Sequence, residues 1–485
     1  MLAVMRQRGI IYFTAALFSI LLSVWAALKT SVINPDAICY LYSARAMEHG
    51  LMLATHLCDQ AKWPFYSMLI FGVTKLTSLS LTASAYCLDG FFSLISVMAF
   101  IAIVNSFTHR TRIIILAAIV ILLAHEFNNL RVDIIRDHGF WAFYLLSLFF
   151  ALRYFMTQKG CYALLWSTSL IVATLFRIEG ILFLLLFPLA AFLGTRQRLK
   201  TFLQLNILTL FGGSILLIGL WLHPQQALGR LTEIPYGAIA WIHSFQRISE
   251  ALVQNVLSVY AVHDALYVAI GMMSVWYLLS VISNVSFIYA VLVLYAWWKK
   301  IAGFSRETYL VLWTYIAINV LITSVFLVEN LFLSARYLVA LSLVLMLWVP
   351  FSLDYLRKWP LWLAGILVIV YGLGGIFDFG HSKKYIRESG DWLATHAAAQ
   401  QKIYSNDYQL LYYSNHFGDA IFTTGRAYEN INVIAQGKWR QYDYIALRLS
   451  ENEWKKNAIV QEIHLTPVAV FQNDRGDQVR IYQNK

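Results

Sequence analysis

The chain has 485 residues, of which 59% are apolar and only 13% are charged. Soluble domains carry roughly 25% charged residues, so this composition excludes a cytosolic enzyme, a nucleic-acid-binding protein and a disordered scaffold. The formal net charge of +11 is expected to follow from the side of a bilayer that the basic residues occupy.

Eleven apolar runs are long enough, or nearly long enough, to cross a bilayer as helices. The run at 266–298 is so long that its first half is expected to protrude or to lie along the interface. The sequence therefore predicts a membrane all-α protein, a polytopic bundle of about eleven transmembrane helices. The predicted spans are residues 10–28, 84–106, 113–125, 139–156, 162–176, 180–194, 203–222, 266–298, 308–328, 336–352 and 360–377.

The loops between these spans predict an orientation, because Lys and Arg are retained on the cytoplasmic side. One set of alternate loops holds 14 basic residues against two acidic ones, Glu307 and Asp354, whereas the other set holds ten basic and twelve acidic residues. The first set is therefore predicted to be cytoplasmic, together with the N-terminus. An odd number of spans then places the C-terminal tail outside.

The tail differs in composition from the rest of the chain. From Asp378 onward, 13 basic and 12 acidic residues occur in 108 positions. We expect residues 1–377 to form the transmembrane domain and residues 378–485 a small soluble α+β domain. The predicted elements of the tail are a helix at 383–399, short strands at 402–405 and 442–446, and a hairpin of strands 468–471 and 478–482 around the turn-rich segment 473–477.

The first outer loop, about residues 29–83, opens with a predicted helix. Asn34 can cap it, Pro35 suits its first turn, and Gly50 can end it, while apolar residues at helical spacing would let one face lie on the membrane. Asp36 falls in the first turn, where a carboxylate is stabilised by the helix N-terminus. Asp36 is thus either a structural acid or a reactive group, and the helix position alone favours neither.

Two cysteines, Cys39 and Cys58, lie in this same loop. They could pair in an oxidising periplasm. Four cysteines in the whole chain are too few for a disulfide framework, so two ordinary thiols are the favoured interpretation.

A second outer segment, residues 126–138, contains six ionisable residues and runs directly into a predicted span. Charges at a membrane edge form either an ion-pair belt or part of a site. Asp137 could converge with Asp36 in one cavity, and converging carboxylates favour acid–base or metal chemistry. Asp137 could equally pair with Arg136, and its flanking Arg131 and Arg136 are expected to hold it ionised. The neighbouring His138 is more typical of a satisfied interfacial residue than of a ligand.

These residues resemble a family of polytopic membrane glycosyltransferases of the GT-C type, which includes the protein O-mannosyltransferases and the lipid A aminoarabinose transferases. In that family a large first outer loop carries a short helix beginning with an acidic residue, as Asp36 does, and a later aspartate precedes the fourth span, as Asp137 does. A basic residue near a proline in the first loop resembles Lys62, although Trp63 intervenes before Pro64. The segments 176–180 and 335–338 also look like family segments.

The resemblance implies an inverting transfer of a sugar from a polyprenyl-phosphate donor on the periplasmic side of a bacterial inner membrane. Asp36 would be the general base, and Asp137 would bind a metal, orient the acceptor or form an ion pair. Cations would stabilise the departing phosphate. The substrate-binding residues carried over from the motifs are Lys62, His138, Arg177, Arg336 and Tyr337.

The resemblance implies no required cofactor, although a divalent metal at Asp137 is possible. The expected partners are the polyprenyl-phosphate sugar, membrane lipids, and an acceptor that is a lipid, a glycan or a protein. The sequence names neither the sugar nor the acceptor. Two alternatives remain open, a transporter or flippase of a lipid-linked substrate and a noncatalytic scaffold. Transport is disfavoured because no internal repeat is visible and the acids gather at span ends, with Asp89 as the main exception.

Overall fold

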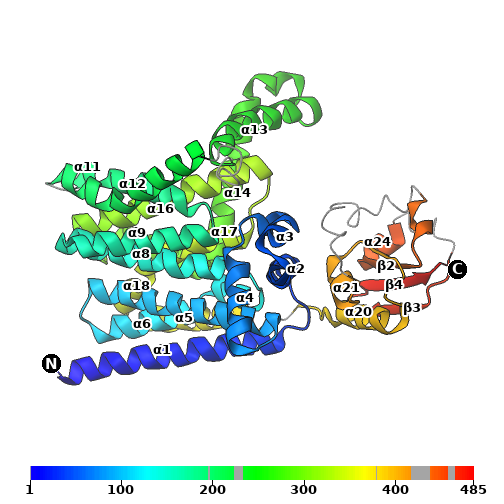
Figure 1. The fold of residues 1–485 in the computed structure, drawn as a ribbon. Helices are drawn as coiled ribbons and strands as arrows, with labels where there is room; N and C mark the ends of the chain where they lie inside the picture. Colours follow the sequence, from blue (N-terminus) through cyan, green and yellow to red (C-terminus); the bar gives the residue numbers. More distant parts are fainter. Residues whose placement is uncertain are drawn as a thin grey trace. The chain divides into compact units, whose positions relative to one another are not determined.

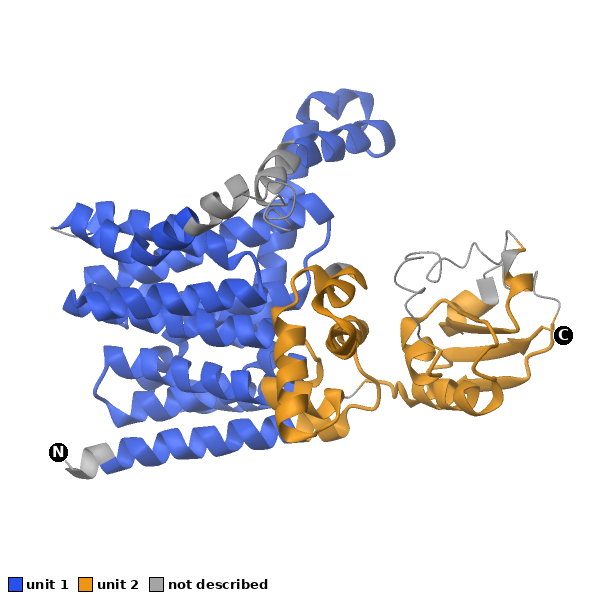
Figure 2. Ribbon diagram, viewed as in Figure 1, with its two compact units in different colours: residues 1–24, 89–131, 136–377 blue, residues 25–88, 132–135, 378–485 orange. Residues whose placement is uncertain are grey.

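A computed structural model describes residues 2–194, 197–222, 233–377, 380–416, 437–456 and 465–484. The chain divides into two compact units, coloured in Figure 2. Unit 1 contains residues 1–24, 89–131 and 136–377, and unit 2 contains residues 25–88, 132–135 and 378–485. Unit 2 therefore combines most of the first outer loop with the tail. Asp378, the predicted first residue of the tail domain, lies outside the described residues.

The chain is a polytopic membrane protein, as predicted. Within the described residues seven helices are long and apolar enough to cross a membrane, and an eighth span results if the bent pair Thr111–Leu122 and His125–Val132 is one span. The helices in the predicted spans are α1 (Leu2–Lys29), α5 (Leu81–Phe107), α6 (Thr111–Leu122), α8 (Asp137–Thr157), α9 (Gly160–Phe176), α10 (Gly180–Leu186), α12 (Arg198–Leu222), α14 (Ala265–Val285), α15 (Phe287–Lys299), α16 (Arg306–Asn330), α17 (Ala335–Leu345), α18 (Val349–Tyr355) and α19 (Trp359–Ile376) (Figure 1). The shorter or connecting helices are α7 (His125–Asn129), η3 (Leu130–Val132), η4 (Phe187–Ala190), α11 (Ala191–Gly194), α13 (Glu233–Asn255), η6 (Val259–Asp264) and η7 (Met346–Trp348).

The long apolar run at 266–298 is two helices. Helix α14 ends at Val285, Ser286 takes a φ of 76°, and α15 begins at Phe287. The segment Val259–Val285 is by itself long and apolar enough to span a membrane. A single residue outside helical geometry thus divides the run, and the expectation that its first half protrudes or lies along the interface stays a prediction.

The core of unit 1 combines aromatic packing with hydrogen bonds around Tyr315 of α16. Its ring lies 5.4 Å from that of Tyr144 and 5.1 Å from that of Phe187, measured between centroids. Its hydroxyl accepts a hydrogen bond from Trp166 Nε1 at 2.9 Å and lies 2.9 Å from Ser147 Oγ. Since water is absent from a bilayer interior, these buried polar groups satisfy one another and hold α8, α9 and α16 together.

The first outer loop of unit 2 folds into short helices. Its first helix, α2, ends at Ala46 and is followed by a 3₁₀ turn and then by Gly50 at a φ of 125°. The residues from Ala37 to Leu41 are all buried, so this part of α2 is packed on every side, whereas Pro35 and Arg45 are exposed. Contact of this helix with the membrane stays a prediction. The elements of the loop are α2 (Pro35–Ala46), η1 (Met47–His49), α3 (Leu51–His56), η2 (Asp59–Lys62) and α4 (Phe65–Thr77).

The tail is an α+β fold with a four-stranded sheet in the order β1-β2-β4-β3. Strands β1 and β2 are parallel, whereas β4 pairs antiparallel with both β2 and β3. The predicted hairpin is present, and Asn473 Oδ1 accepts the amide hydrogens of Arg475 and Asp477 in its turn. The described elements are α20 (Lys384–His396), β1 (Ile403–Ser405), α21 (Tyr408–Tyr413), η9 (Lys438–Gln441), β2 (Tyr444–Leu449), α24 (Glu451–Lys456), β3 (Ala469–Gln472) and β4 (Gln478–Gln483).

Candidate active site

Asp36 is half-buried in the first turn of α2 in unit 2. Its Oδ1 accepts a hydrogen bond from Gln60 Nε2 at 3.3 Å. The expected cap by Asn34 does not form. The Asn34 side chain instead accepts the amide hydrogen of Ile134 at 2.9 Å and donates to the Ile134 carbonyl at 3.2 Å. The segment before Asp36 is therefore fixed by a contact 100 residues away in the chain.

A disulfide between Cys39 and Cys58 joins α2 to the start of η2. The favoured interpretation of two free thiols was wrong, because the packing of the loop brings the two Cα atoms to 6.1 Å, which is within disulfide range. Cys39 follows Asp36 by one helical turn, and Cys58 directly precedes η2, which carries Gln60 and Lys62. The cross-link thus holds α2, which carries Asp36, against η2, which carries Gln60 and Lys62. Lys62 is exposed at the end of η2.

Removing this disulfide is expected to destabilise the loop. For a closed loop of this size, the chain-entropy model gives roughly 3 kcal/mol. The double variant Cys39→Ser/Cys58→Ser should therefore lose resistance to proteolysis within residues 30–80 when it is assayed in detergent. The matched control is Cys87→Ser/Cys161→Ser, which removes the two exposed thiols. Equal proteolysis of both double variants and the parent would show that the cross-link does not stabilise the loop.

A buried ion-pair cluster lies in unit 1 where α8 begins and α9 ends. Arg177 forms an ion pair with Asp137, and its Nη2 donates to Glu179 Oε1 at 2.6 Å. The Arg177 and Asp137 side chains are only 8% and 3% exposed. The Tyr337 ring centroid lies 4.3 Å from Arg177 Cζ and 5.2 Å from Arg336 Cζ. The structure thus brings together four predicted site residues, Asp137, Arg177, Arg336 and Tyr337.

Close packing of two helices makes this ion pair possible. Gly139 is in the first turn of α8, and a Cβ atom there would overlap the Phe176 ring at the end of α9. Phe176 directly precedes Arg177, and Gly139 follows Asp137 by two residues. The glycine therefore allows the helix ends to approach closely enough for the Arg177 guanidinium to meet the Asp137 carboxylate.

The cluster carries more positive than negative charge. Arg136 and Arg336 act electrostatically on Asp137, and Arg136 also acts on Glu179. Three guanidinium groups and two carboxylates give a formal charge of +1. Arg136 Nη1 is buried and has no hydrogen-bond partner among the described residues. An unsatisfied buried donor beside an excess positive charge is suited to binding an anion.

Glu179 is ionised in this cluster. Burial alone would raise the pKa of its carboxyl group, but the charge and hydrogen bond of Arg177 outweigh burial and lower the pKa to about 2. Burial opposes the charged form of Arg177 too, yet the neighbouring Asp137 and Glu179 raise its pKa well above the usual value. Glu179 and Arg177 are therefore charged at neutral pH.

Arg131 and His138 have partners that differ from those predicted or required for a role at the site. Arg131 does not hold Asp137. Its guanidinium donates to Ser19, Ser23 and Asn128 instead, and Arg177 pairs with Asp137. The predicted role of Arg131 was therefore wrong, whereas the other flanking arginine, Arg136, does act electrostatically on Asp137.

His138 is fully buried, with Nδ1 3.4 Å from Ser93 Oγ and Nε2 3.1 Å from the Leu130 carbonyl. A substrate contact at His138 would require those two hydrogen bonds to change.

The described part of the chain holds no group of three or more His, Cys, Asp or Glu side chains that could bind a metal ion. A metal at Asp137 would have to displace Arg177.

The predicted site residues are divided between the two units. Asp36 and Lys62 belong to unit 2. The residues in unit 1 are Asp137, His138, Arg177, Arg336 and Tyr337. The convergence of the two carboxylates stays a prediction.

Sequence reasoning missed two residues of the site, Gln60 and Glu179. Gln60 could not be predicted, because nothing in the sequence around a single loop glutamine indicates its contact with Asp36, 24 residues away. Glu179 lies in segment 176–180, which resembles a segment of the glycosyltransferase family. Its position two residues after Arg177 could have indicated a local ion pair.

Comparison with known proteins gives matches among solved structures alone. No family model matches the chain, and no curated protein does. Two crystal structures of ArnT from Cupriavidus metallidurans are similar in fold, each over 97% of both chains. The apo structure has a TM-score of 0.40 at 11% sequence identity. The structure bound to undecaprenyl phosphate has a TM-score of 0.42 at 12% identity.

ArnT is a lipid A aminoarabinose transferase of GT-C fold. It belongs to one of the families that the motifs of this chain resemble.

Proposed function

We propose that this protein is an inverting glycosyltransferase that moves a sugar from a polyprenyl-phosphate donor to an envelope acceptor on the periplasmic side of a bacterial inner membrane. The observation that carries the proposal is the disulfide-linked pair α2 and η2. It places the half-buried carboxylate of Asp36 in hydrogen-bond contact with Gln60, on the element that ends in Lys62. A positioned carboxylate, with a cation on the element cross-linked to its helix, suits proton abstraction next to a departing phosphate.

The proposed reaction has one displacement step. Asp36 removes the proton of the acceptor nucleophile while that nucleophile attacks the anomeric carbon of the donor. The bond between the anomeric carbon and the phosphate oxygen breaks, and the polyprenyl phosphate leaves with the bonding electron pair on the opposite face, which inverts the anomeric configuration. Positive charge is needed where the phosphate leaves.

The arginine cluster supports a phosphate-binding role in unit 1. Its formal charge is +1, and it includes the buried unsatisfied donor Arg136 Nη1. Guanidinium groups bind phosphate oxygens through paired hydrogen bonds, and the low dielectric of a membrane domain strengthens that contact. We assign Arg136, Arg177 and Arg336 to donor phosphate binding, with Asp137 and Glu179 holding Arg177 in place.

Two independent observations support the periplasmic side. The cytoplasmic assignment of one loop set depends on its 14 basic residues, and the first outer loop belongs to the other set. That loop contains the Cys39–Cys58 disulfide. Disulfides persist in an oxidising compartment and are rare in the cytosol. Charge distribution and cysteine pairing therefore agree.

Cysteine labelling tests this orientation. In a background lacking only Cys87 and Cys161, we expect a membrane-impermeant maleimide to label Ser382→Cys in spheroplasts. Ser382 is exposed in the tail, and the matched control His109→Cys is exposed in a predicted cytoplasmic loop. His109→Cys should react after permeabilisation alone. The reversed pattern would place the tail and the candidate base in the cytoplasm.

Loss of the Asp137 carboxylate is expected to weaken donor binding. Asp137→Asn keeps the side-chain shape but removes the main buried partner of Arg177, so the guanidinium becomes less well oriented. The affinity for polyprenyl phosphate, measured by native mass spectrometry, should fall by roughly tenfold, as for one lost charged hydrogen bond. Unchanged donor affinity and turnover in a folded variant would make Asp137 a purely structural ion-pair member.

Envelope lipids of the native cell test the function. Mass spectrometry of lipid extracts from cells with and without the protein should show accumulation of a polyprenyl-phosphate sugar and loss of one glycosylated species when the protein is absent. A lipid-linked sugar that only changes its side of the membrane, with no change in composition, would favour the transporter or flippase.

A further inference from the structure

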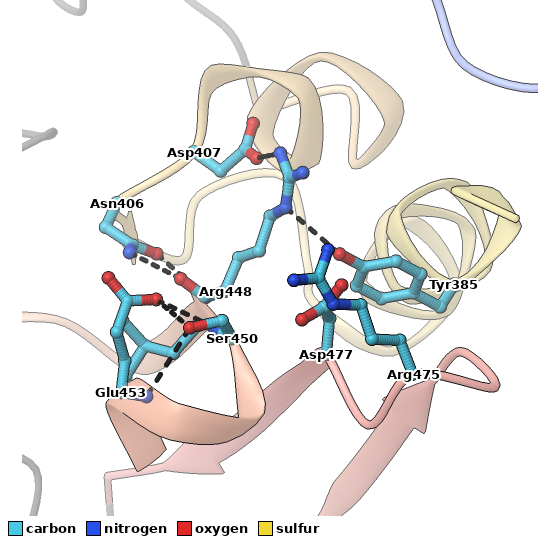
Figure 3. A pocket seen from close by; sticks show the side chains of 9 residues that line it. Tyr385, Asn406, Asp407, Arg448, Ser450, Glu453, Arg475 and Asp477 are labelled. Atoms are coloured by element: carbon cyan, nitrogen blue, oxygen red, sulfur yellow. Dashed lines mark hydrogen bonds and ion pairs between the residues drawn. The ribbon is translucent and has the colours of Figure 1, made fainter. Parts of the chain in front are cut away.

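The tail contains a pocket of about 410 Å³, shown in Figure 3. Asn406 and Asp407 follow β1 directly, while Arg448 lies near the end of β2 and Ser450 follows it. Strands β1 and β2 are parallel, so the pocket lies where both strands reach their carboxyl ends. In open sheets with parallel strands, ligands bind at that edge. The volume also lies within the range of small-molecule sites.

The polar groups of the pocket are held in place by hydrogen bonds. Arg448 Nη1 donates to Asp407 Oδ2 at 2.5 Å, and Arg448 Nε donates to Tyr385 Oη at 3.2 Å. Glu453 Oε2 accepts hydrogen bonds from the amide and the hydroxyl of Ser450, at 2.8 and 2.7 Å. Fixed donors and acceptors lose little conformational entropy when a ligand binds. The pocket is therefore preorganised.

The charges in the pocket exclude several classes of ligand. Three carboxylates, Asp407, Glu453 and Asp477, face two guanidinium groups, Arg448 and Arg475, so the formal charge is −1. Phosphates, nucleotides and other anions are disfavoured by this balance. Leu449 and the Tyr385 ring are the apolar part of the lining, which is too little for a lipid chain. The combination suits a ligand rich in hydroxyl groups that both donate and accept.

Two of the charged groups are held in their ionised forms by their partners. Burial would lower the pKa of Arg448, but the Asp407 carboxylate raises it. Hydrogen bonds from Ser450 lower the pKa of Glu453. The pocket thus offers guanidinium donors and carboxylate acceptors at the same time, as Figure 3 shows for Arg448, Arg475 and Asp477.

Hydrogen bonds connect the pocket to the loop that carries the candidate base. Arg448 Nη1 also donates to Gln409 Oε1 at 3.2 Å, and Gln409 Nε2 donates to the Ile33 carbonyl at 2.6 Å. The amide hydrogen of Ile33 is donated to Tyr413 Oη at 2.9 Å. Ile33 precedes Asp36 by three residues. All these residues lie in unit 2, so the pocket is bonded directly to the segment that enters α2.

We propose that this pocket is a carbohydrate subsite that binds an uncharged or amino sugar unit of the acceptor. The proposal rests on the proposed glycosyl transfer and adds the acceptor class to it. An acceptor glycan held here would be bound by the same unit that presents Asp36.

Saturation-transfer NMR on the full-length protein in nanodiscs tests this subsite. The probes are the methyl glycosides of glucose, galactose, mannose, N-acetylglucosamine and glucosamine, with methyl glucuronide and inorganic phosphate as anionic comparators. We expect transfer to at least one uncharged or amino glycoside. Arg475→Ala should weaken that binding by about tenfold, the effect of one lost charged hydrogen bond. Lys402→Ala removes an exposed positive charge of the tail outside the pocket lining and should leave binding unchanged.

Three results would overturn the subsite: no glycoside receives saturation, Arg475→Ala binds as well as the parent, or the anionic probes alone bind. The Asp36→Asn variant separates this proposal from the proposed function, because it should lose transfer and still bind the glycoside. Glycoside binding in a protein that never transfers sugar would uphold the subsite and contradict the transferase.

Discussion

Asp36→Asn is expected to abolish sugar transfer while folding and donor binding persist. The amide keeps the size of the side chain and can still accept the hydrogen bond from Gln60, but it cannot accept the proton of the acceptor. General-base assistance contributes roughly 10²–10⁴-fold to a rate. A lost contact with the helix N-terminus would account for about 1 kcal/mol, or roughly fivefold. The two roles of Asp36 therefore differ clearly in the size of the effect.

The matched control for this variant is Glu48→Gln. Glu48 lies in the same outer loop and forms an exposed ion pair with Lys75 at 2.7 Å, so its neutralisation should leave turnover within about twofold, as for surface pairs. If Asp36→Asn retained transfer within about fivefold of the parent, the Asp36 carboxylate would be structural. The base would then have to be sought among Glu48, Asp59 and Asp137.

Arg177→Met is expected to destabilise the membrane domain by about 3–5 kcal/mol, because it leaves the buried carboxylate of Asp137 and the half-buried carboxylate of Glu179 without their shared cation. Asp137 and Glu179 both depend on this guanidinium. Thermal unfolding in detergent, followed by size-exclusion chromatography, should show a much lower midpoint or no folded peak. The matched control is Arg110→Met. Arg110 pairs with Asp354 at 3.4 Å and its side chain is 76% exposed, so its loss should cost at most about 1 kcal/mol.

A triple variant separates the loss of charge balance from the loss of packing. Asp137→Asn/Arg177→Met/Glu179→Gln removes both carboxylate charges together with the cation, and it should recover most of the stability lost in Arg177→Met. If Arg177→Met has the same unfolding midpoint as the parent, the buried ion pair does not hold the ends of α8 and α9 together. If the triple variant is no more stable than Arg177→Met, then packing around the guanidinium dominates.

Much of the fold could be predicted from the sequence because its signals are local. Each predicted span lies in a helix or a short series of helices, since an apolar run of that length has few other stable states in a membrane. The hairpin of the tail follows from the turn-rich segment 473–477 between alternating strands. The break at Ser286 was not predicted, because neither glycine nor proline marks it. Residues 37–41 are buried by tertiary packing, which periodicity does not report.

The candidate site was predictable in its residue types and less so in its contacts. Asp36 is identified by its place in a helix first turn, and Arg177 by its segment. The partner of Asp137 was misassigned because the Arg177 ion pair joins residues 40 positions apart and depends on the close approach at Gly139. The Cys39–Cys58 disulfide likewise depends on how η2 packs against α2. Contacts of this kind are set by packing between elements, and a single sequence carries no local signal for them.

The most direct test of the proposed transfer is the release of free polyprenyl phosphate by the purified protein. Proteoliposomes that contain the native cell's envelope lipids, supplied with its envelope glycans and proteins, provide both donor and acceptor. Mass spectrometry can follow the donor, the free polyprenyl phosphate and the glycosylated product. We predict that the parent converts the donor into polyprenyl phosphate and one glycosylated product in equal amounts, and that Asp36→Asn converts none. An intact donor after incubation with the folded parent, or equal conversion by Asp36→Asn, would contradict the account.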